Sequence, residues 1–399
     1  MSTPAAVATL RAQSHPITAI AFHSSNLRLV SGDDDGWCIQ WSLVTRRPLA
    51  VWKSHSAALL TVKWMSDELL LTHGRDNKLY LHRLNDSPLD TDIPSADNNP
   101  DDWRRPWLVA SLDVNALNFC PAATWGTNRI AVPGTLDSDT VDVYDLLPEL
   151  RRPYKAVQPK FKTVTICSVG IVMAIELMED RLIAGYESGH VAIFKLHEDG
   201  ISTKIYLCKA HSQPILSVAL HPADSTFISS GADSKIVKHP LYPQLSNIEC
   251  KTVTEFGDDD DMTESAYLRM VDIKHTGIAS IDIRDDEKIC AVACWDGMVR
   301  VFLYKSLKLL ASFKGGRQQG ITCTKFGRTE LSDVAGLASD DSENPADTTA
   351  DDIALTRVFD RNRAVFSSTV MSKREQMVRN QHWLAVGGKD GKIGLWEIY

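Results

Sequence analysis

The sequence predicts an all-β fold in which seven similar units close into a ring. Segments starting at His15, His55, His211 and His275 share one pattern: a histidine, an alternating apolar run, a second short run and a polar turn. A small polar or acidic residue is also followed six positions later by an aromatic residue or His, seven times in all. These pairs are Asp35/Trp41, Asp76/His82, Ser138/Tyr144, Ser188/Phe194, Asp233/His239, Asp296/Phe302 and Asp390/Trp396.

Composition narrows the class of protein. With 399 residues, of which 44% are hydrophobic, the chain is long enough for one large all-β domain. A net charge of −8 argues against direct nucleic-acid binding, which needs a basic face. The absence of long uncharged apolar runs and of a signal-peptide pattern predicts no membrane contact. The eight cysteines form no CxxC pair, so we expect no metal or cofactor and a reducing compartment, cytosol or nucleus.

Each pair in the six-residue spacing describes a turn followed by a period-2 strand with a ring near its end. A β-sandwich does not place the same residue types at the same offsets seven times, so the spacing favours seven equivalent units. Their four-stranded pattern resembles the WD40 repeats, whose units are the blades of a β-propeller. In that family a structural tetrad joins a His before the first strand, a Ser or Thr on the second, an Asp in the next turn and a Trp on the third.

The resemblance assigns tetrad positions residue by residue. Because a buried Asp needs hydrogen-bond partners, the resemblance implies that these histidines are structural and not catalytic. Blade one carries His15, Ser31, Asp35 and Trp41; blade two His55, Thr72 and Asp76, with His82 in the Trp position; blade five His211, Ser229 and Asp233, with His239 in that position; blade six Asp296; and blade seven Asp390 and Trp396.

The chain ends on a third strand, and its beginning matches the fourth strand that precedes blade five. Residues near Val7 to Arg11 are therefore predicted to complete the last blade, which removes an exposed sheet edge. The prediction is an all-β, seven-bladed WD40 β-propeller closed by an N-terminal strand, with residues 1–399 as a single domain.

Three segments exceed the repeat length and are rich in acids, near 86–105, 257–266 and 328–380. Such composition predicts solvated loops. A calcium loop is the alternative, but the run Asp258–Asp261 lacks the ligand plan of an EF-hand. The last insertion is placed between the first and second strands of blade seven.

No catalytic motif is present, so we expect no enzyme. A propeller enzyme needs polar groups that converge on the central channel, and the pattern indicates none. The resemblance to WD40 propellers implies partner binding at the rim formed by the turns after the second strands. Three residues there are candidates, Arg75, Trp295 and Lys389. For Trp295, packing over a neighbouring blade is an equally good interpretation.

Longer strings are more specific than the repeat. LLTHGRDNKLYLHRL (Leu70–Leu84), VPGTLDSDTVDVYDL (Val132–Leu146), GYESGHVAIF (Gly185–Phe194) and the terminal AVGGKDGKIGLWEIY resemble the fungal ASTRA-associated protein family, which is similar to the animal G-protein β-subunit-like protein 1.

The family resemblance implies a scaffold subunit of the ASTRA complex. The implied partners are PI3K-related kinases such as the transformation/transcription-associated protein, the Tel2–Tti cochaperones and the RuvB-like ATPases. The implied roles are chromatin remodelling and kinase assembly. The implied location is the nucleus, with the cytoplasm as a second location. The alternative is a WD40 reader of histone tails or degrons in another chromatin or ubiquitin-ligase complex.

Overall fold

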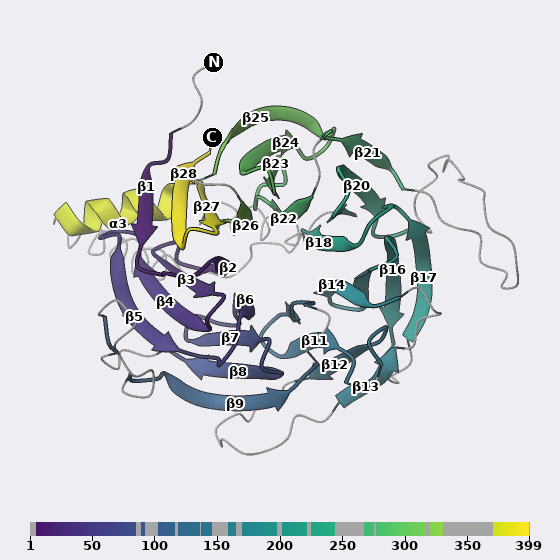
Figure 1. Ribbon diagram of the computed structural model, residues 1–399, viewed down its shortest axis with the longest axis horizontal. Coiled ribbons are helices and arrows are strands. Elements are labelled where there is room, and N and C mark those ends of the chain that lie inside the picture. Colours follow the sequence, from purple (N-terminus) through teal and green to yellow (C-terminus); the bar gives the residue numbers. More distant parts are fainter. Residues whose placement is uncertain are drawn as a thin grey trace, which may run out of the picture.

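The computed structural model describes residues 5–84, 89–91, 103–115, 119–135, 137–145, 159–164, 170–197, 202–221, 225–243, 267–274, 277–315, 320–329 and 370–398. Seven four-stranded antiparallel sheets stand around a ring, each with its first strand innermost (Figure 1). This arrangement confirms the predicted seven-bladed β-propeller. The described residues contain no helix long and apolar enough to cross a membrane.

The blades follow the chain. Blade one is β2 (Ile17–Phe22), β3 (Arg28–Asp33), β4 (Trp37–Ser42) and β5 (Arg47–Lys53). Blade two is β6 (Leu59–Trp64), β7 (Leu69–Gly74), β8 (Lys78–Arg83) and β9 (Trp107–Asp113). Blade three is β10 (Ala123–Trp125), β11 (Arg129–Pro133), β12 (Val141–Asp145) and β13 (Pro159–Val164). Blade four is β14 (Val172–Met178), β15 (Arg181–Tyr186), β16 (His190–Leu196) and β17 (Ser202–Lys209).

The remaining three blades close the ring. Blade five is β18 (Ile215–Leu220), β19 (Thr226–Gly231), β20 (Lys235–Pro240) and β21 (Arg269–Asp272). Blade six is β22 (Ile278–Ile283), β23 (Ile289–Cys294), β24 (Met298–Leu303) and β25 (Lys308–Lys314). Blade seven is β26 (Ile321–Phe326), β27 (Trp383–Gly388), β28 (Lys392–Glu397) and β1 (Ala8–Arg11).

The core lies between neighbouring blades. Second strands such as β23 and β27 are buried along their whole length, because both faces of the sheet pack against another blade. One cluster joins Ile193 and Tyr206 of blade four to Phe227 of blade five, and the other clusters repeat this arrangement around the ring. In outer strands such as β25, most side chains are exposed or half-buried, and exposed and buried positions do not alternate regularly.

The predicted closure is confirmed. Strand β1 pairs antiparallel with β28, from Ala8 opposite Leu395 to Arg11 opposite Lys392. Leu10 is buried in the cluster that joins blades seven and one. The two ends of the chain therefore share one sheet, in which β1 occupies the outer position (Figure 1).

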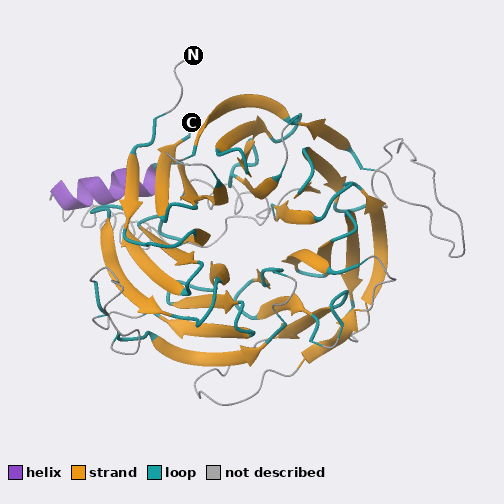
Figure 2. Ribbon diagram, in the orientation of Figure 1, coloured by secondary structure: helices purple, strands orange, loops and turns teal. Residues whose placement is uncertain are grey.

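A helix, α3 (Val370–Asn380), occupies the end of the insertion predicted as a loop at 328–380, which does lie between the first and second strands of blade seven. Figure 2 shows this helix projecting past the edge of the ring beside blades seven and one. The Asn26 side chain in the first turn of blade one donates to the carbonyls of Val378, Arg379 and Gln381 at 3.3, 3.1 and 3.0 Å. Residues 330–369 lie outside the described residues.

The insertion at 86–105 differs from a fully solvated loop where it is described. The Asp90 carbonyl accepts a hydrogen bond from Val51 N at 2.7 Å, on the outer edge of blade one. Trp103 is only 8% exposed, and its ring meets Trp37 edge-on at 5.3 Å. These apolar contacts hold the second half of the insertion against blade one. The segment 257–266 and His275 lie outside the described residues.

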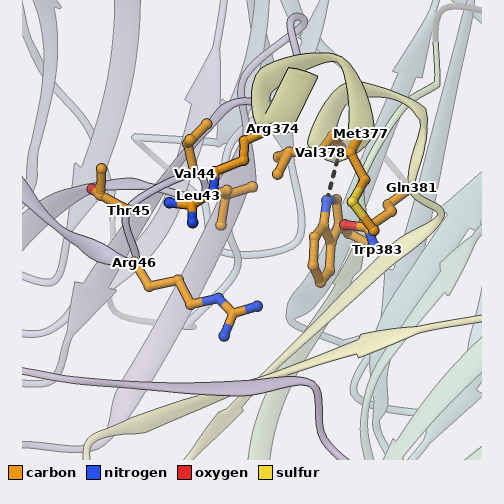
Figure 3. A pocket seen from close by; sticks show the side chains of 9 residues that line it. All are labelled: Leu43, Val44, Thr45, Arg46, Arg374, Met377, Val378, Gln381 and Trp383. Atoms are coloured by element: carbon orange, nitrogen blue, oxygen red, sulfur yellow. Dashed lines mark hydrogen bonds between the residues drawn. The ribbon is translucent and has the colours of Figure 1, made fainter. Parts of the chain in front are cut away.

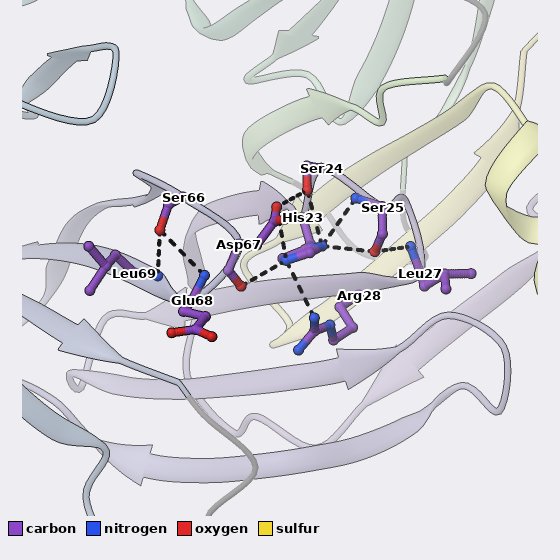
Figure 4. A network of polar contacts seen from close by, with 9 residues as sticks. All are labelled: His23, Ser24, Ser25, Leu27, Arg28, Ser66, Asp67, Glu68 and Leu69. Carbon is purple, nitrogen blue, oxygen red and sulfur yellow. Dashed lines mark hydrogen bonds and ion pairs between the residues drawn. The ribbon is translucent and has the colours of Figure 1, made fainter. Parts of the chain in front are cut away.

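At the end of the ring opposite the predicted rim, His23 joins blades one and two (Figure 4). Its Nδ1 lies 2.8 Å from Ser25 Oγ, and its Nε2 lies 3.0 Å from the Asp67 carbonyl oxygen. Trp64 meets the ring edge-on at 4.8 Å. Burial lowers the pKa of His23, and the nearby charge of Arg28 lowers it further, so the imidazole serves as a neutral link between two turns.

Candidate partner-binding rim

The seven rings in the six-residue spacing all lie on the third strands of successive blades. Every one is buried, from 0% exposed for His239 to 7% for Tyr144. The spacing therefore marks the same structural position in each blade: Trp41, His82, Tyr144, Phe194, His239, Phe302 and Trp396.

Blade five joins its predicted tetrad residues into one network. His211 Nδ1 lies 2.8 Å from Asp233 Oδ1, and His211 Nε2 lies 2.9 Å from Ser229 Oγ. Ser229 Oγ continues to His239 Nε2 at 2.8 Å. Burial raises the pKa of Asp233, but the hydrogen bond and charge of His211 outweigh it, so the net pKa is lowered. The network fixes the turn to the blade and leaves none of these four side chains open to substrate.

Blade two uses the same arrangement with one extra link. His55 contacts Asp76 Oδ1 and Thr72 Oγ1, both at 2.9 Å. Ser54 Oγ bridges Thr72 Oγ1 and His82 Nε2, at 3.1 Å to each. Burial, together with the charge of His55, lowers the pKa of His82 to about 3.

Blade one departs from the predicted tetrad at two positions. Trp41 Nε1 donates to Ser31 Oγ at 2.9 Å as expected, but Ser31 Oγ donates to Gln13 Oε1 at 2.6 Å, whereas His15 is exposed. The turn carboxylate is Asp33, which accepts from Trp37 N at 2.9 Å. The assignment of His15 is therefore corrected to Gln13.

The predicted Asp35 of blade one lies outside this network. It accepts from Lys53 Nζ at 2.7 Å and is 43% exposed. Asp33 occupies the position of Gly74 and Gly231, where a side chain would meet the imidazoles of His55 and His211 at 2.4 and 3.3 Å. With Gln13 in place of an imidazole, that space accepts a carboxylate. Burial raises the pKa of Asp33 to about 6.

In blades six and seven the turn Asp accepts a hydrogen bond from a cationic side chain on the third strand of its own blade. Asp296 receives Arg300 Nη2 at 2.6 Å, and Asp390 receives Lys392 Nζ at 2.8 Å. In blade seven the position of the tetrad serine is Val386, and Trp396 Nε1 is buried without a hydrogen-bond partner. The ring there is held by packing, with Phe313 at 5.2 Å.

The centre of the ring carries charged side chains that the sequence pattern does not indicate. Lys63 of β6 lies 3.8 Å from Glu176 of β14, although blade three stands between their blades. Lys325 of β26 lies 2.5 Å from Asp282 of the neighbouring β22. The sequence pattern indicates no polar groups that converge on the channel, and it misses these two ion pairs of the innermost strands. The four charged groups form two ion pairs between innermost strands, which suits a structural role.

The predicted rim positions share a backbone contact. In six blades the amide of the residue before the turn's polar position donates to a carbonyl at the start of the innermost strand, as Trp295 N does to Gly277 O at 3.0 Å. This contact places the rim side chains around one end of the ring. Consecutive blades six, seven, one and two supply Trp295, Lys389, Asp34 and Arg75, which we call the rim arc.

Trp295 is 47% exposed, and its indole packs over Gly277 just before the first strand of its own blade. A Cβ at Gly277, whose φ is +72°, would come within 1.9 Å of the indole, so glycine is required there. Lys389 packs in the same way over Gly320. The Arg75 guanidinium lies 3.9 Å above the ring of Phe119, which is 53% exposed. Each aromatic ring is held by a neighbouring group and remains about half exposed.

Phe119, which sequence reasoning missed, sits in the connection between blades two and three with a φ of +58°. The six described cysteines are buried and free, and burial raises the pKa of Cys290 to about 12. Across the described ranges, no three His, Cys, Asp or Glu side chains gather as a metal ion would need.

Known proteins are similar to this chain over nearly its full length. The family model described as ASTRA-associated protein 1 matches residues 6–396. The ASTRA-associated protein 1 of Yarrowia lipolytica is 33% identical, and the alignment covers 99% of this chain and 94% of the relative. That of Penicillium rubens is 35% identical over 98% and 96%, and that of Schizosaccharomyces pombe 30% identical over 86% and 98%.

Proposed function

Because the chain belongs to the ASTRA-associated protein 1 family, we propose that it acts as a non-catalytic scaffold subunit of the ASTRA complex. The proposal extends to chromatin remodelling and to the assembly of PI3K-related kinases with the Tel2–Tti cochaperones and RuvB-like ATPases, in the nucleus. The rim arc is the observation that carries it. The imidazoles of His55 and His211 are engaged in structural hydrogen bonds, so the exposed rim side chains are the groups available for recognition.

The chemistry of the rim arc is that of an interface centre. Trp and Arg are enriched at binding hot spots, and Trp295 and Arg75 are both exposed and backed by the fold. Since the backing contacts fix these side chains before binding, less conformational entropy is lost when a partner covers them.

A purification from native extract tests the proposal. Full-length tagged wild type and Trp295→Ala are compared with Trp107→Ala, which removes a tryptophan that is 64% exposed on the outer strand β9. We expect wild type and W107A to recover kinases and cochaperones equally, and W295A to recover about tenfold less or lower still. Equal recovery by W295A and wild type contradicts a role for the rim.

A peptide reader is the second candidate. Blades three and four place the exposed acids Asp137 and Glu187 at the same end of the ring, a chemistry that suits a basic peptide such as a histone tail. The same purification separates the two functions: recovery of histones alone, or of ubiquitin-ligase components, favours the reader and overturns the ASTRA proposal.

A further inference from the structure

A groove lies between helix α3 and the turn that joins the third and fourth strands of blade one. Its volume is about 400 Å³, within the roughly 300–1,000 Å³ range of ligand sites. Figure 3 shows Arg374 reaching from the helix toward Leu43 and Val44, with Arg46 extending from the turn. Met377, Val378 and Trp383 form the opposite wall.

Both sides of this groove are held in place. Trp383 Nε1 donates to the Val378 carbonyl at 3.0 Å, and Asn26, only 1% exposed, binds three carbonyls at the end of the helix. On the turn side, Arg46 N donates to the Ser42 carbonyl at 2.8 Å. A ligand therefore meets walls that are already positioned, which lowers the entropic cost of binding.

The electrostatics of the groove oppose those of the whole chain. The protein carries a net charge of −8, yet the lining contains two arginines and no acid. Neither Arg46 nor Arg374 forms an ion pair with another described residue, and both are exposed. Arg379 adds positive charge in the last turn of α3. Guanidinium groups in such a setting suit carboxylates, which they bind with two parallel hydrogen bonds.

The apolar part of the groove limits the ligand further. Met377 is 64% exposed, and methionine adapts its shape to a varied apolar partner. Trp383 is 2% exposed and makes the same wall rigid. We propose that this groove binds an acidic peptide segment of a partner protein, with one large apolar side chain against Met377 and Trp383 and carboxylates on Arg46 and Arg374. The surface is separate from the rim arc, so it goes beyond the function proposed above.

Fluorescence anisotropy with purified full-length protein tests this inference. The probe is a short fluorescein-labelled peptide with a central Leu flanked by Glu and Asp; its matched control carries Gln and Asn instead. We expect the acidic probe to bind, the amide peptide to bind at least about tenfold more weakly, and the double variant Arg46→Glu/Arg374→Glu to lose binding to a similar degree. Lys308→Glu, an exposed change of the same sign on β25, leaves the affinity unchanged. Thermal unfolding checks that each variant is folded.

Three results overturn the proposal. One is equal affinity of the double variant and wild type for the acidic probe. Another is equally tight binding of single-stranded DNA through the same arginines, which means that the surface recognises charge alone. The third is a gain of tenfold or more in probe affinity when the acids of 340–352 are replaced by amides, which assigns the groove to the chain's own insertion. Because the assay contains no ASTRA component, its failure leaves the rim proposal standing.

Discussion

Blade five and blade one hold the same ring position by different chemistry. In blade five an imidazole joins the second-strand serine to the turn carboxylate, through His211, Ser229 and Asp233. In blade one an amide, Gln13, reaches the serine, and the carboxylate of Asp33 binds backbone amides instead. The shared requirement is a bonded hydroxyl beneath the ring, while the group that bonds it varies with the space left at the turn.

The largest effect is expected from removing the imidazole that links two groups. His211→Ala leaves Asp233 and Ser229 short of a partner inside the blade, and should lower the free energy of unfolding by about 3 to 5 kcal/mol. His15→Ala removes an exposed ring outside the blade-one network and should cost less than about 0.5 kcal/mol. Denaturant midpoints measure both. Equal costs would mean that the two blades do not differ as described.

The sequence predicted the ring, its closure and the seven ring positions, because a six-residue spacing and a strand period are local properties of the chain. Residue type alone places the blade-one histidine at His15, in the run His15-Pro16-Ile17, and this prediction is wrong. In blades two and five the histidine stands four residues before the first strand. In blade one the residue at that distance is Gln13.

Features that depend on distant contacts were not predictable. The Lys63–Glu176 pair joins strands from blades that are not neighbours, and Phe119 gains its role only by lying under Arg75. The groove beside α3 needs Asn26 to hold a helix more than 300 residues later in the chain. The repeat register predicts the positions of the rim candidates Arg75, Trp295 and Lys389. It does not predict the packing contacts that orient their side chains.

A second way to sharpen the comparison is pH, since blade two buries a histidine where blades four and six bury phenylalanine. The folded-state pKa of His82, about 3, lies below the ordinary value near 6.5, so its protonation opposes folding. The stability that the neutral His82 ring contributes to the fold is fully present above about pH 6.5 and is lost as the pH falls toward 3.

His82→Phe should remove this loss. Between pH 6 and 4 we expect the variant's stability to fall less steeply than that of wild type, by up to about 1.4 kcal/mol per pH unit. Unfolding midpoints across this range measure the slope, with His197→Ala as a control outside the blade networks. A wild-type slope in H82F would show that His82 does not titrate on unfolding.

The smallest effect is the most specific test, because it tries to restore the blade-one chemistry in blade seven. Trp396 Nε1 is buried without a partner, and Val386 stands ten residues before it, as Ser31 stands before Trp41. Val386→Thr places a hydroxyl where that indole can donate to it.

Val292→Thr makes the same change in blade six, where Phe302 offers no donor. A buried hydroxyl costs free energy in both blades. The hydrogen bond from Trp396 should therefore make V386T about 1 kcal/mol less destabilising than V292T in denaturant unfolding. If the two substitutions cost the same, the hydroxyl under the ring does not by itself recreate the link, and the exposed end of the blade must supply a second partner as Gln13 does in blade one.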